Sequence, residues 1–319
     1  MLEISDFKAK QIIVSFCNDG DKIKIQNDNV LIIDKDGEIK CQCTCYRLFS
    51  IFVVGNTTLT SVLIERAKKF GFTIVLFTSS FRVYEVIGFR RDANFLLHRK
   101  QYEYDSLDIA KHLIRNKISN QLTLLSRQRK KEFDYRNISQ KFHEHAAMVD
   151  GAKTVQEIMG YEGMASKTFF LHHFKEYDWH GRRPRVKNDY INSILDIGYT
   201  VLFAFIESML SIYGFDVYCG VLHTMFYMRK SLVCDVMEPF RAIVDEQVKK
   251  SLNLGQFKES DFKFINRRFE LEWEKSKKYV AIILNAILNY KEDIFKYFRQ
   301  YYRAVMKGKA VSEFPVFEV

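Results

Sequence analysis

The segment from Gly220 to Asp245 holds the residues best suited to bind a metal ion. It contains His223 and two acids, Asp235 and Glu238, with apolar residues around the acids. Three positions separate the acids, so on a helix they project from the same face and can converge on one cation. The apolar neighbours predict that this helix is buried. Two buried carboxylates repel each other unless a cation, a proton or an arginine neutralises them.

The neighbours of Glu238 leave two interpretations open. Arg241 lies three residues further on and can form a structural ion pair with Glu238 instead of leaving it to a metal. Pro239 cannot donate a backbone hydrogen bond to the carbonyl of Asp235, which predicts a helix kink at a cost of about 3 kcal/mol. A lone histidine such as His223 is more often a core residue than a ligand, but the nearby acids favour a ligand role. Histidine and carboxylate ligands without thiolates suit Mg²⁺ or Mn²⁺.

A third acid, Glu162, stands between Gly160 and Gly163. The glycines predict a helix that begins at Gly163, which would put Glu162 at the helix start. An acid at that position stabilises the helix dipole, so a capping role is the alternative to metal binding.

The excess of basic residues favours a polyanionic partner. Lys and Arg outnumber Asp and Glu by 49 to 39, which gives a net charge of +10 and a pI near 9.1. Such a balance is typical of proteins that bind nucleic acid or an anionic membrane. The first candidates for phosphate contacts lie in one predicted loop: Arg182, Arg183, Arg185 and Lys187. A second basic cluster contains Arg127, Arg129, Lys130 and Lys131. A solvated basic loop is the alternative for each.

The elements that must position these residues divide into a β-rich part and a helical part. Short β-branched runs separated by Asn, Asp and Gly predict hairpin strands at 12–14, 22–25, 30–33 and 41–45, and further strands at 48–54, 73–77 and 82–87. Residues 58–70 have helical spacing and end at Gly71. The sequence thus predicts an α+β fold, with a small N-terminal β-rich domain over residues 1–90.

Beyond Arg91 the strand signals end, and apolar residues recur at helical spacing. We therefore expect a larger all-helical domain over residues 91–319. Its predicted helices cover residues 106–129, 138–159, 163–177, 189–213, 232–252 and 271–305. The apolar stretch from Ile194 to Phe215 contains two acids, so it is interpreted as a buried helix and no membrane association is expected. Six cysteines without a paired Cys-x-x-Cys spacing, and no secretory signal, predict a cytoplasmic protein with reduced thiols.

Several motifs taken together resemble one known family. In order they span Gly160 to Phe170, Arg182 to Pro184, Asn192 to Tyr199, Leu222-His223 and Asp235 to Arg241. This series resembles the CRISPR adaptation integrase family, Cas protein one, across residues 110–245. Two positions depart from the family pattern: Glu238 stands where many relatives carry aspartate, and Phe169 replaces a tyrosine.

The resemblance implies roles for the candidate residues. Glu162, His223 and Glu238 would be the metal ligands and Asp235 a neighbouring acid of the catalytic site. Which of the two acids touches the metal, and whether one or two metals bind, stay open. Arg241 joins the loop residues as a candidate DNA contact.

The reaction implied is a metal-dependent transesterification. The 3′-hydroxyl of a spacer DNA fragment would attack a phosphodiester at the border of the CRISPR repeat. The expected partners are double-stranded DNA from both sources, a second copy of the chain joined through the β-rich domain, larger assemblies, and a second CRISPR adaptation protein.

Two other functions fit the same residues. One is a metal-dependent endonuclease that hydrolyses branched DNA with water in place of the hydroxyl. The other is a non-enzymatic basic scaffold that binds DNA, with its acids neutralised by Arg241 and other bases.

Overall fold

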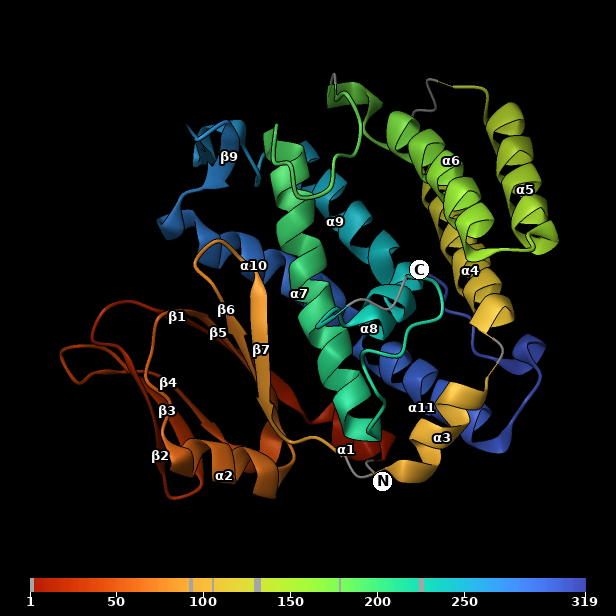
Figure 1. Ribbon diagram of the computed structural model, residues 1–319. Coiled ribbons are helices and arrows are strands. Elements are labelled where there is room, and N and C mark those ends of the chain that lie inside the picture. Colours follow the sequence, from red (N-terminus) through yellow and green to blue (C-terminus); the bar gives the residue numbers. More distant parts are fainter. Residues whose placement is uncertain (1–2, 92–93, 105, 129–132, 178, 224–226) are drawn as a thin grey trace. The chain divides into compact units, whose positions relative to one another are not determined.

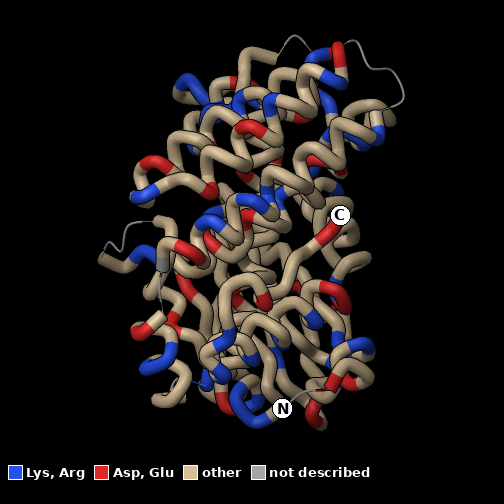
Figure 2. The backbone as a smooth tube through the Cα atoms, turned by 90° about the vertical axis from the view of Figure 1, so that its right-hand side faces the viewer, with Lys and Arg blue, Asp and Glu red and all other residues tan. Residues whose placement is uncertain are grey.

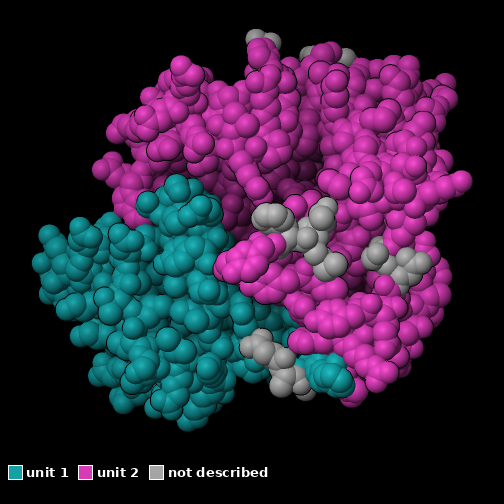
Figure 3. Space-filling view, in the orientation of Figure 1, with its two compact units in different colours: residues 1–95, 207–215 teal, residues 96–206, 216–319 magenta. Residues whose placement is uncertain are grey.

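The computed structural model describes residues 3–91, 94–104, 106–128, 133–177, 179–223 and 227–319. The chain divides into two compact units, which are coloured separately in Figure 3. Unit 1 contains residues 1–95 and 207–215, and unit 2 contains residues 96–206 and 216–319. A β-rich N-terminal region followed by a helical region confirms the predicted α+β class. The boundary predicted after residue 90 stays a prediction.

Unit 1 contains two sheets. The first has the strand order β1-β5-β6-β7, in which only the β6–β7 pair is antiparallel: β1 (Gln11–Cys17), β5 (Leu48–Gly55), β6 (Thr73–Phe77) and β7 (Val83–Gly88). The second is an antiparallel sheet of β2 (Lys22–Gln26), β3 (Asn29–Ile33) and β4 (Ile39–Thr44). The unit also contains α1 (Ile4–Lys8), the 3₁₀ turn η1 (Cys45–Arg47) and α2 (Ser61–Phe70), which ends at Gly71 as predicted.

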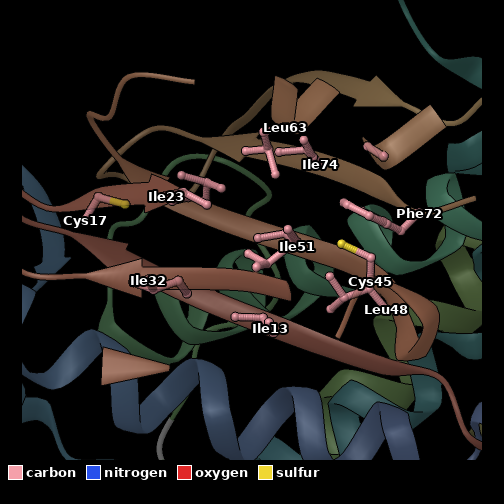
Figure 4. Close-up of a cluster of buried hydrophobic side chains, with 13 residues drawn as sticks. Ile13, Cys17, Ile23, Ile32, Cys45, Leu48, Ile51, Leu63, Phe72 and Ile74 are labelled. Carbon is pink, nitrogen blue, oxygen red and sulfur yellow. The ribbon is translucent and has the colours of Figure 1, made fainter. Parts of the chain in front are cut away.

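The core of unit 1 explains why β1 does not form the predicted hairpin with β2. Strand β5 is buried over seven of its eight residues, which is typical of a central strand with both faces covered. It therefore takes β1 and β6 as parallel neighbours, and the turn after β1 carries the chain to the second sheet. Figure 4 shows side chains from both sheets and α2 that form this core, among them Ile13, Ile32, Ile51 and Leu63.

Unit 2 is mostly helical. Its elements are α3 (Phe95–Glu103), α4 (Ser106–Ser126), α5 (Tyr135–Gly151), α6 (Val155–His173), the 3₁₀ turn η2 (Lys175–Tyr177), the part of α7 (Tyr190–Tyr213) up to residue 206, α8 (Ser231–Val236), the 3₁₀ turn η3 (Glu238–Phe240), α9 (Arg241–Asn253), the 3₁₀ turn η4 (Glu259–Asp261), β8 (Phe262–Ile265), β9 (Arg268–Leu271), α10 (Trp273–Asn289), α11 (Lys291–Lys307) and the 3₁₀ turn η5 (Val311–Glu313). Helices α4, α5 and α6 pack side by side (Figure 1).

Four details of the helical prediction are wrong. The helix predicted over residues 232–252 is interrupted by η3, which separates α8 from α9. The β8–β9 hairpin shows that strands do not end at Arg91. The predicted helix from Leu271 to Val305 is two helices that meet at Tyr290. The predicted break near Gly160 lies instead at residues 152–154, where Thr154 accepts a hydrogen bond from the Glu157 amide and starts α6.

Helix α7 carries the stretch interpreted from sequence as a buried helix, and that interpretation is confirmed. It is long and apolar enough to cross a membrane, but 83% of its most apolar window is buried within the protein. A Cβ atom built on Gly198 would lie 2.4 Å from a methyl carbon of Val244, which is far too close. Glycine is therefore needed for α7 to approach α9 at this point.

Candidate metal and catalytic site

Two of the predicted site acids meet at one lysine. Glu162 from α6 and Glu238 from η3 both contact the ammonium of Lys117 on α4, and the Glu238 Oε2 atom lies 2.7 Å from Lys117 Nζ. The Lys117 side chain is only 10% exposed and the Glu238 side chain 5%. The two acids thus share one buried cation, although 75 residues separate them in sequence.

The location of Glu162 differs from the prediction. It lies in the middle of α6 and not at a helix start, so a capping role is excluded. Ser166, one turn further on, donates a hydrogen bond of 2.7 Å to Oε1 of Glu162. Gln121 on α4 in turn donates to the Ser166 hydroxyl at 3.2 Å. These contacts orient the carboxylate towards α4.

Glu238 also forms an ion pair with Arg241, which is the alternative to metal binding that the sequence left open. The Nε atom of Arg241 lies 2.8 Å from Oε2 of Glu238. Burial alone would raise the pKa of Glu238, but the charges of Arg241 and Lys117 outweigh burial and lower the pKa to about 2. The same acids raise the pKa of Lys117 despite its burial. Glu238 and Lys117 are therefore both ionised at neutral pH and are held together by their opposite charges.

Asp235 has a different set of partners. It is fully buried, and its two oxygens accept hydrogen bonds from the backbone amides of Val221, Leu222 and His223, the last at 3.0 Å. Oδ1 also accepts a hydrogen bond from Nδ1 of the His223 ring at 2.6 Å. A carboxylate can only accept, so Nδ1 carries the proton and Nε2 is left as the ring nitrogen that can bind a metal.

These contacts separate two acids that sequence spacing had placed on one helix face. Helix α8 ends at Val236, and Pro239 lies in the 3₁₀ turn η3. Asp235 therefore faces the turn at residues 220–223, while Glu238 faces α4. The geometry favours Glu238 as the acid available to a metal and Asp235 as the residue that orients His223.

Gly220 allows the close approach of the turn to Asp235. A Cβ atom at residue 220 would lie 2.7 Å from Oδ2 of Asp235 and 2.5 Å from Cβ of Ser231. Any larger residue would push the 220–223 backbone away from the carboxylate. Gly220 thus allows the backbone at His223 to lie against Asp235.

The donor set fits a divalent cation in chemistry, but its three members are not gathered around one common position. Across the part of the chain that the structure describes, no three His, Cys, Asp or Glu side chains are close enough to hold a metal. The His223 ring is nonetheless near enough to Glu238 to help lower its pKa. Glu162 and Glu238 already converge on a cation, which is Lys117. Imidazole and carboxylate donors of this kind suit Mn²⁺ or Mg²⁺.

A second buried network lies behind Arg241. Its guanidinium lies 4.5 Å from the ring centre of Tyr199, whose hydroxyl donates a 2.5 Å hydrogen bond to Asp245. Burial raises the pKa of Asp245 to about 6, against the lowering effect of the Tyr199 hydrogen bond and nearby bases. Nε2 of His173 donates a hydrogen bond of 3.2 Å to the Asp245 carbonyl, and burial lowers the pKa of His173 to about 3. This network fixes the direction of Arg241.

The predicted basic loop contains two kinds of arginine. Arg182 is turned inward, where it pairs with Asp196 at 2.5 Å and donates to Asn192, so its geometry gives no support to a DNA contact. Arg183 and Arg185 are exposed. Lys187 is half-buried, and its carbonyl accepts a hydrogen bond from the backbone of the β8–β9 hairpin.

The second basic cluster is only partly described. Arg127 lines an open hollow of about 870 Å³ together with Lys249 and Lys250. Arg129, Lys130 and Lys131 lie outside the described residues. Figure 2 shows that Lys and Arg segments are interspersed with Asp and Glu along the chain, so the net charge of +10 is spread over the molecule.

Lys117, Ser166, Tyr199 and Asp245 belong to these networks but were not predicted as site residues. A signal for Lys117 existed in the sequence. Polar residues at positions 116, 117, 120 and 121 recur with helical spacing inside an otherwise apolar helix, and all four are buried. Buried polar residues on one helix face require partners, so such a face indicates a polar site.

The fold and this cluster define an α+β protein whose helical unit carries a buried arrangement of acids, bases and a histidine. Comparison with known families identifies it further. The family described as CRISPR-associated protein Cas1 matches residues 16–283, so the chain belongs to the Cas1 family, and the resemblance seen in the sequence is confirmed.

Individual relatives agree with this assignment. The chain is 27% identical over 266 residues to a CRISPR-associated endonuclease Cas1 from Saccharolobus solfataricus, covering 80% of this chain and 75% of that relative. The fold of this chain is similar to that of a casposase bound to an integration product, with a TM-score of 0.80 and 21% identity. The match covers 97% of this chain and 94% of the casposase chain. The fold is also similar to a chain of a Cas6-RT-Cas1–Cas2 complex, with a TM-score of 0.83, 20% identity and coverage of 97% and 36%.

Proposed function

We propose that this protein is a CRISPR adaptation integrase that joins the 3′-hydroxyl of a spacer DNA fragment to the border of a CRISPR repeat by metal-dependent transesterification. The observation that carries the proposal is the convergence of Glu162 and Glu238 on one buried cation, close to a histidine whose free ring nitrogen is fixed by Asp235. Three such donors from separate elements match the needs of a divalent cation that acts on a phosphodiester.

The relatives support a reaction on DNA. The Saccharolobus protein is named an endonuclease, and the casposase structure contains an integration product. Hydrolysis and strand joining differ only in whether water or a 3′-hydroxyl attacks the phosphorus, so one site can serve either reaction.

Glu162, His223 and Glu238 would hold Mn²⁺ or Mg²⁺. When bound, the cation would polarise the scissile phosphate and favour the deprotonated form of the attacking hydroxyl. Asp235 keeps the proton on Nδ1 of His223, which leaves Nε2 as the nitrogen able to bind the cation. Arg241 is held beside Glu238 by the Tyr199 ring and would stabilise negative charge that develops on the phosphate oxygens.

The proposed partners are double-stranded DNA, a second copy of the chain and Cas2. The net charge of +10 supports binding of DNA, and the exposed Arg183 and Arg185 are the first candidates for its phosphates. The similarity to a chain from a Cas1–Cas2 complex supports the Cas2 partner. A cytoplasmic location is supported by six free cysteines.

The test is strand transfer with labelled DNA that carries a free 3′-hydroxyl, a supercoiled plasmid with a CRISPR repeat, Mn²⁺, and Cas2. Wild type is compared with Glu162→Gln and His223→Ala. The matched controls are Glu144→Gln and His143→Ala, because both residues are exposed on α5 in the same unit. We expect joined products from wild type and both controls, and losses of 100-fold or more in both site variants.

The other outcomes distinguish the two alternatives. Shorter strands without joined ones, lost in the same two variants, would replace the integrase with a nuclease. DNA binding that does not respond to Mn²⁺, with no change in strand length, would favour a DNA-binding scaffold whose acids stay paired with Lys117 and Arg241.

A further inference from the structure

The cation between the two site acids belongs to the protein itself. Lys117 Nζ contacts Glu162 Oε1 and Glu238 Oε2 at the same time, and no other base among the described residues contacts both acids. Of these two acids, Arg241 contacts Glu238 and not Glu162 among the described residues. Two carboxylates that meet at one position, Glu238 buried and Glu162 24% exposed, would repel each other without a cation between them.

We propose that Lys117 is an exchangeable counter-ion: its ammonium neutralises Glu162 and Glu238 when no divalent metal is bound, and it leaves its place between them when the metal enters. The inference rests on the proposed function, because it concerns the same ligands. It adds a residue that sets the affinity of the site for metal without being a ligand itself.

The chemistry of the two bases makes Lys117 the one that exchanges. A lysine ammonium is a compact charge at the end of a flexible four-carbon chain, so it can withdraw by rotation about its own bonds. The Arg241 guanidinium is planar and lies over the Tyr199 ring, 4.5 Å from its centre, which holds it in one orientation. A metal held by both carboxylates would take the position that the ammonium now has, and two cations cannot share that position.

A purely structural lysine would behave differently. If Lys117 served only to hold α4 against α6 and η3, its removal would loosen the ligands and weaken metal binding. If Lys117 competes with the metal, its removal must strengthen metal binding, because the metal then binds the two carboxylates without first displacing an ammonium from between them. The direction of the change therefore separates the two roles.

The experiment is a titration with Mn²⁺ alone, followed by the electron paramagnetic resonance signal of the free ion. It compares wild type with Lys117→Met and Lys117→Gln, which are two neutral replacements in case one does not fold. The matched control is Lys111→Met on the same helix, because Lys111 pairs with Asp108 and not with the site acids. Circular dichroism confirms that each variant is folded.

We expect both Lys117 variants to bind Mn²⁺ at least tenfold more tightly than wild type and Lys111→Met to match wild type. Thermal melting should agree: without metal the Lys117 variants melt below wild type, and saturating Mn²⁺ should raise their melting temperature more than that of wild type. Equal or weaker Mn²⁺ binding by the Lys117 variants would overturn the inference.

The Glu162→Gln and His223→Ala variants separate this failure from failure of the proposed function. If wild-type Mn²⁺ binding depends on Glu162 and His223 but not on Lys117, only the counter-ion role is lost. The metal site itself is wrong if Glu162→Gln and His223→Ala leave Mn²⁺ binding unchanged, both alone and combined with a Lys117 substitution. It is also wrong if none of the proteins binds Mn²⁺.

Discussion

Asp235→Asn tests whether Asp235 orients the histidine or binds the metal. The Asp235 carboxylate accepts four hydrogen bonds: Oδ2 accepts from two backbone amides, and Oδ1 from the amide and ring of His223. Asparagine has only one acceptor oxygen. Whichever way its amide is turned, two donors lose their acceptor and face an NH₂ group instead.

The structure gives the size of the effect. A buried donor left without a partner costs about 1–3 kcal/mol, so two of them should lower the free energy of unfolding by about 2–6 kcal/mol. Loss of the partner that orients a metal-binding histidine usually weakens metal binding by about 10- to 100-fold. Urea denaturation followed by circular dichroism measures the first quantity, and Mn²⁺ titration measures the second.

His223→Ala is the matched comparison for Asp235→Asn. It removes the ring and its one hydrogen bond to the carboxylate but leaves three backbone amides there, so we expect it to lower the free energy of unfolding by about 1.5–3 kcal/mol while it removes a proposed metal ligand. The reasoning would be refuted if Asp235→Asn were as stable as wild type. It would also be refuted if the variant bound Mn²⁺ as wild type does.

Three further predictions concern the second buried network, helix packing and DNA contacts. The pKa of Asp245 is about 6 in the folded protein, compared with 3.8 for an unperturbed aspartate. The contribution of Asp245 to the stability of the folded state is therefore fully present below pH 3.8 and is lost as pH rises through 6. Asp245→Asn should therefore raise the free energy of unfolding by up to about 3 kcal/mol at pH 8 and by almost nothing at pH 3.5, which chemical denaturation at both pH values would check. Gly198→Ala should lower the free energy of unfolding by about 1–3 kcal/mol, because the added methyl group would collide with Val244; an unchanged urea midpoint would contradict this packing. Arg183→Ala with Arg185→Ala should reduce the slope of log K for duplex DNA against log salt by about 2, measured by fluorescence anisotropy, and an unchanged slope would remove these residues from the DNA surface.

Local signals predicted the β-rich region well. The turn at Asn27 and Asp28 has the positive φ angles of 47° and 55° that its residue types favour, and it joins β2 to β3 as expected. Thr60 caps the start of α2 and Gly71 ends it. Strand partners were less predictable, because β1 pairs with β5 across a gap of more than 30 residues. No local pattern encodes that choice.

In the helical region the prediction gave two glycines too much importance. Gly160 and Gly163 were expected to interrupt a helix, but a helix can tolerate each glycine at a cost of about 1 kcal/mol. The stronger signal was the pair of Thr154 and Glu157, where the threonine side chain accepts from the Glu157 amide and the glutamate accepts from the amide of Lys153. This capping arrangement sets the true start of α6.

The sequence identified the acids and the histidine as candidate site residues. It did not indicate that Asp235 and Glu238 have different partners. Spacing put Asp235 and Glu238 on one helix face, and the residue types identified them as a pair. Their separation follows from the end of α8 before Pro239 and from partners far away in sequence. Lys117 lies more than 100 residues before Glu238, so only the packing of α4 against η3 brings them together.

The charges of the assembled site suggest why metal and DNA should bind together. Glu162, Asp235 and Glu238 contribute three formal negative charges, and Lys117 and Arg241 contribute two positive ones. Lys117 withdraws only by rotation about its own bonds, so its charge stays near the site. A divalent cation therefore changes the net charge of the site and its immediate surroundings from −1 to +1, which is unfavourable in a buried region unless an anion follows. A single phosphodiester group supplies one negative charge and brings the sum to zero. Metal binding should therefore strengthen the binding of a phosphodiester at this site, and by linkage DNA should strengthen the binding of metal to the same extent.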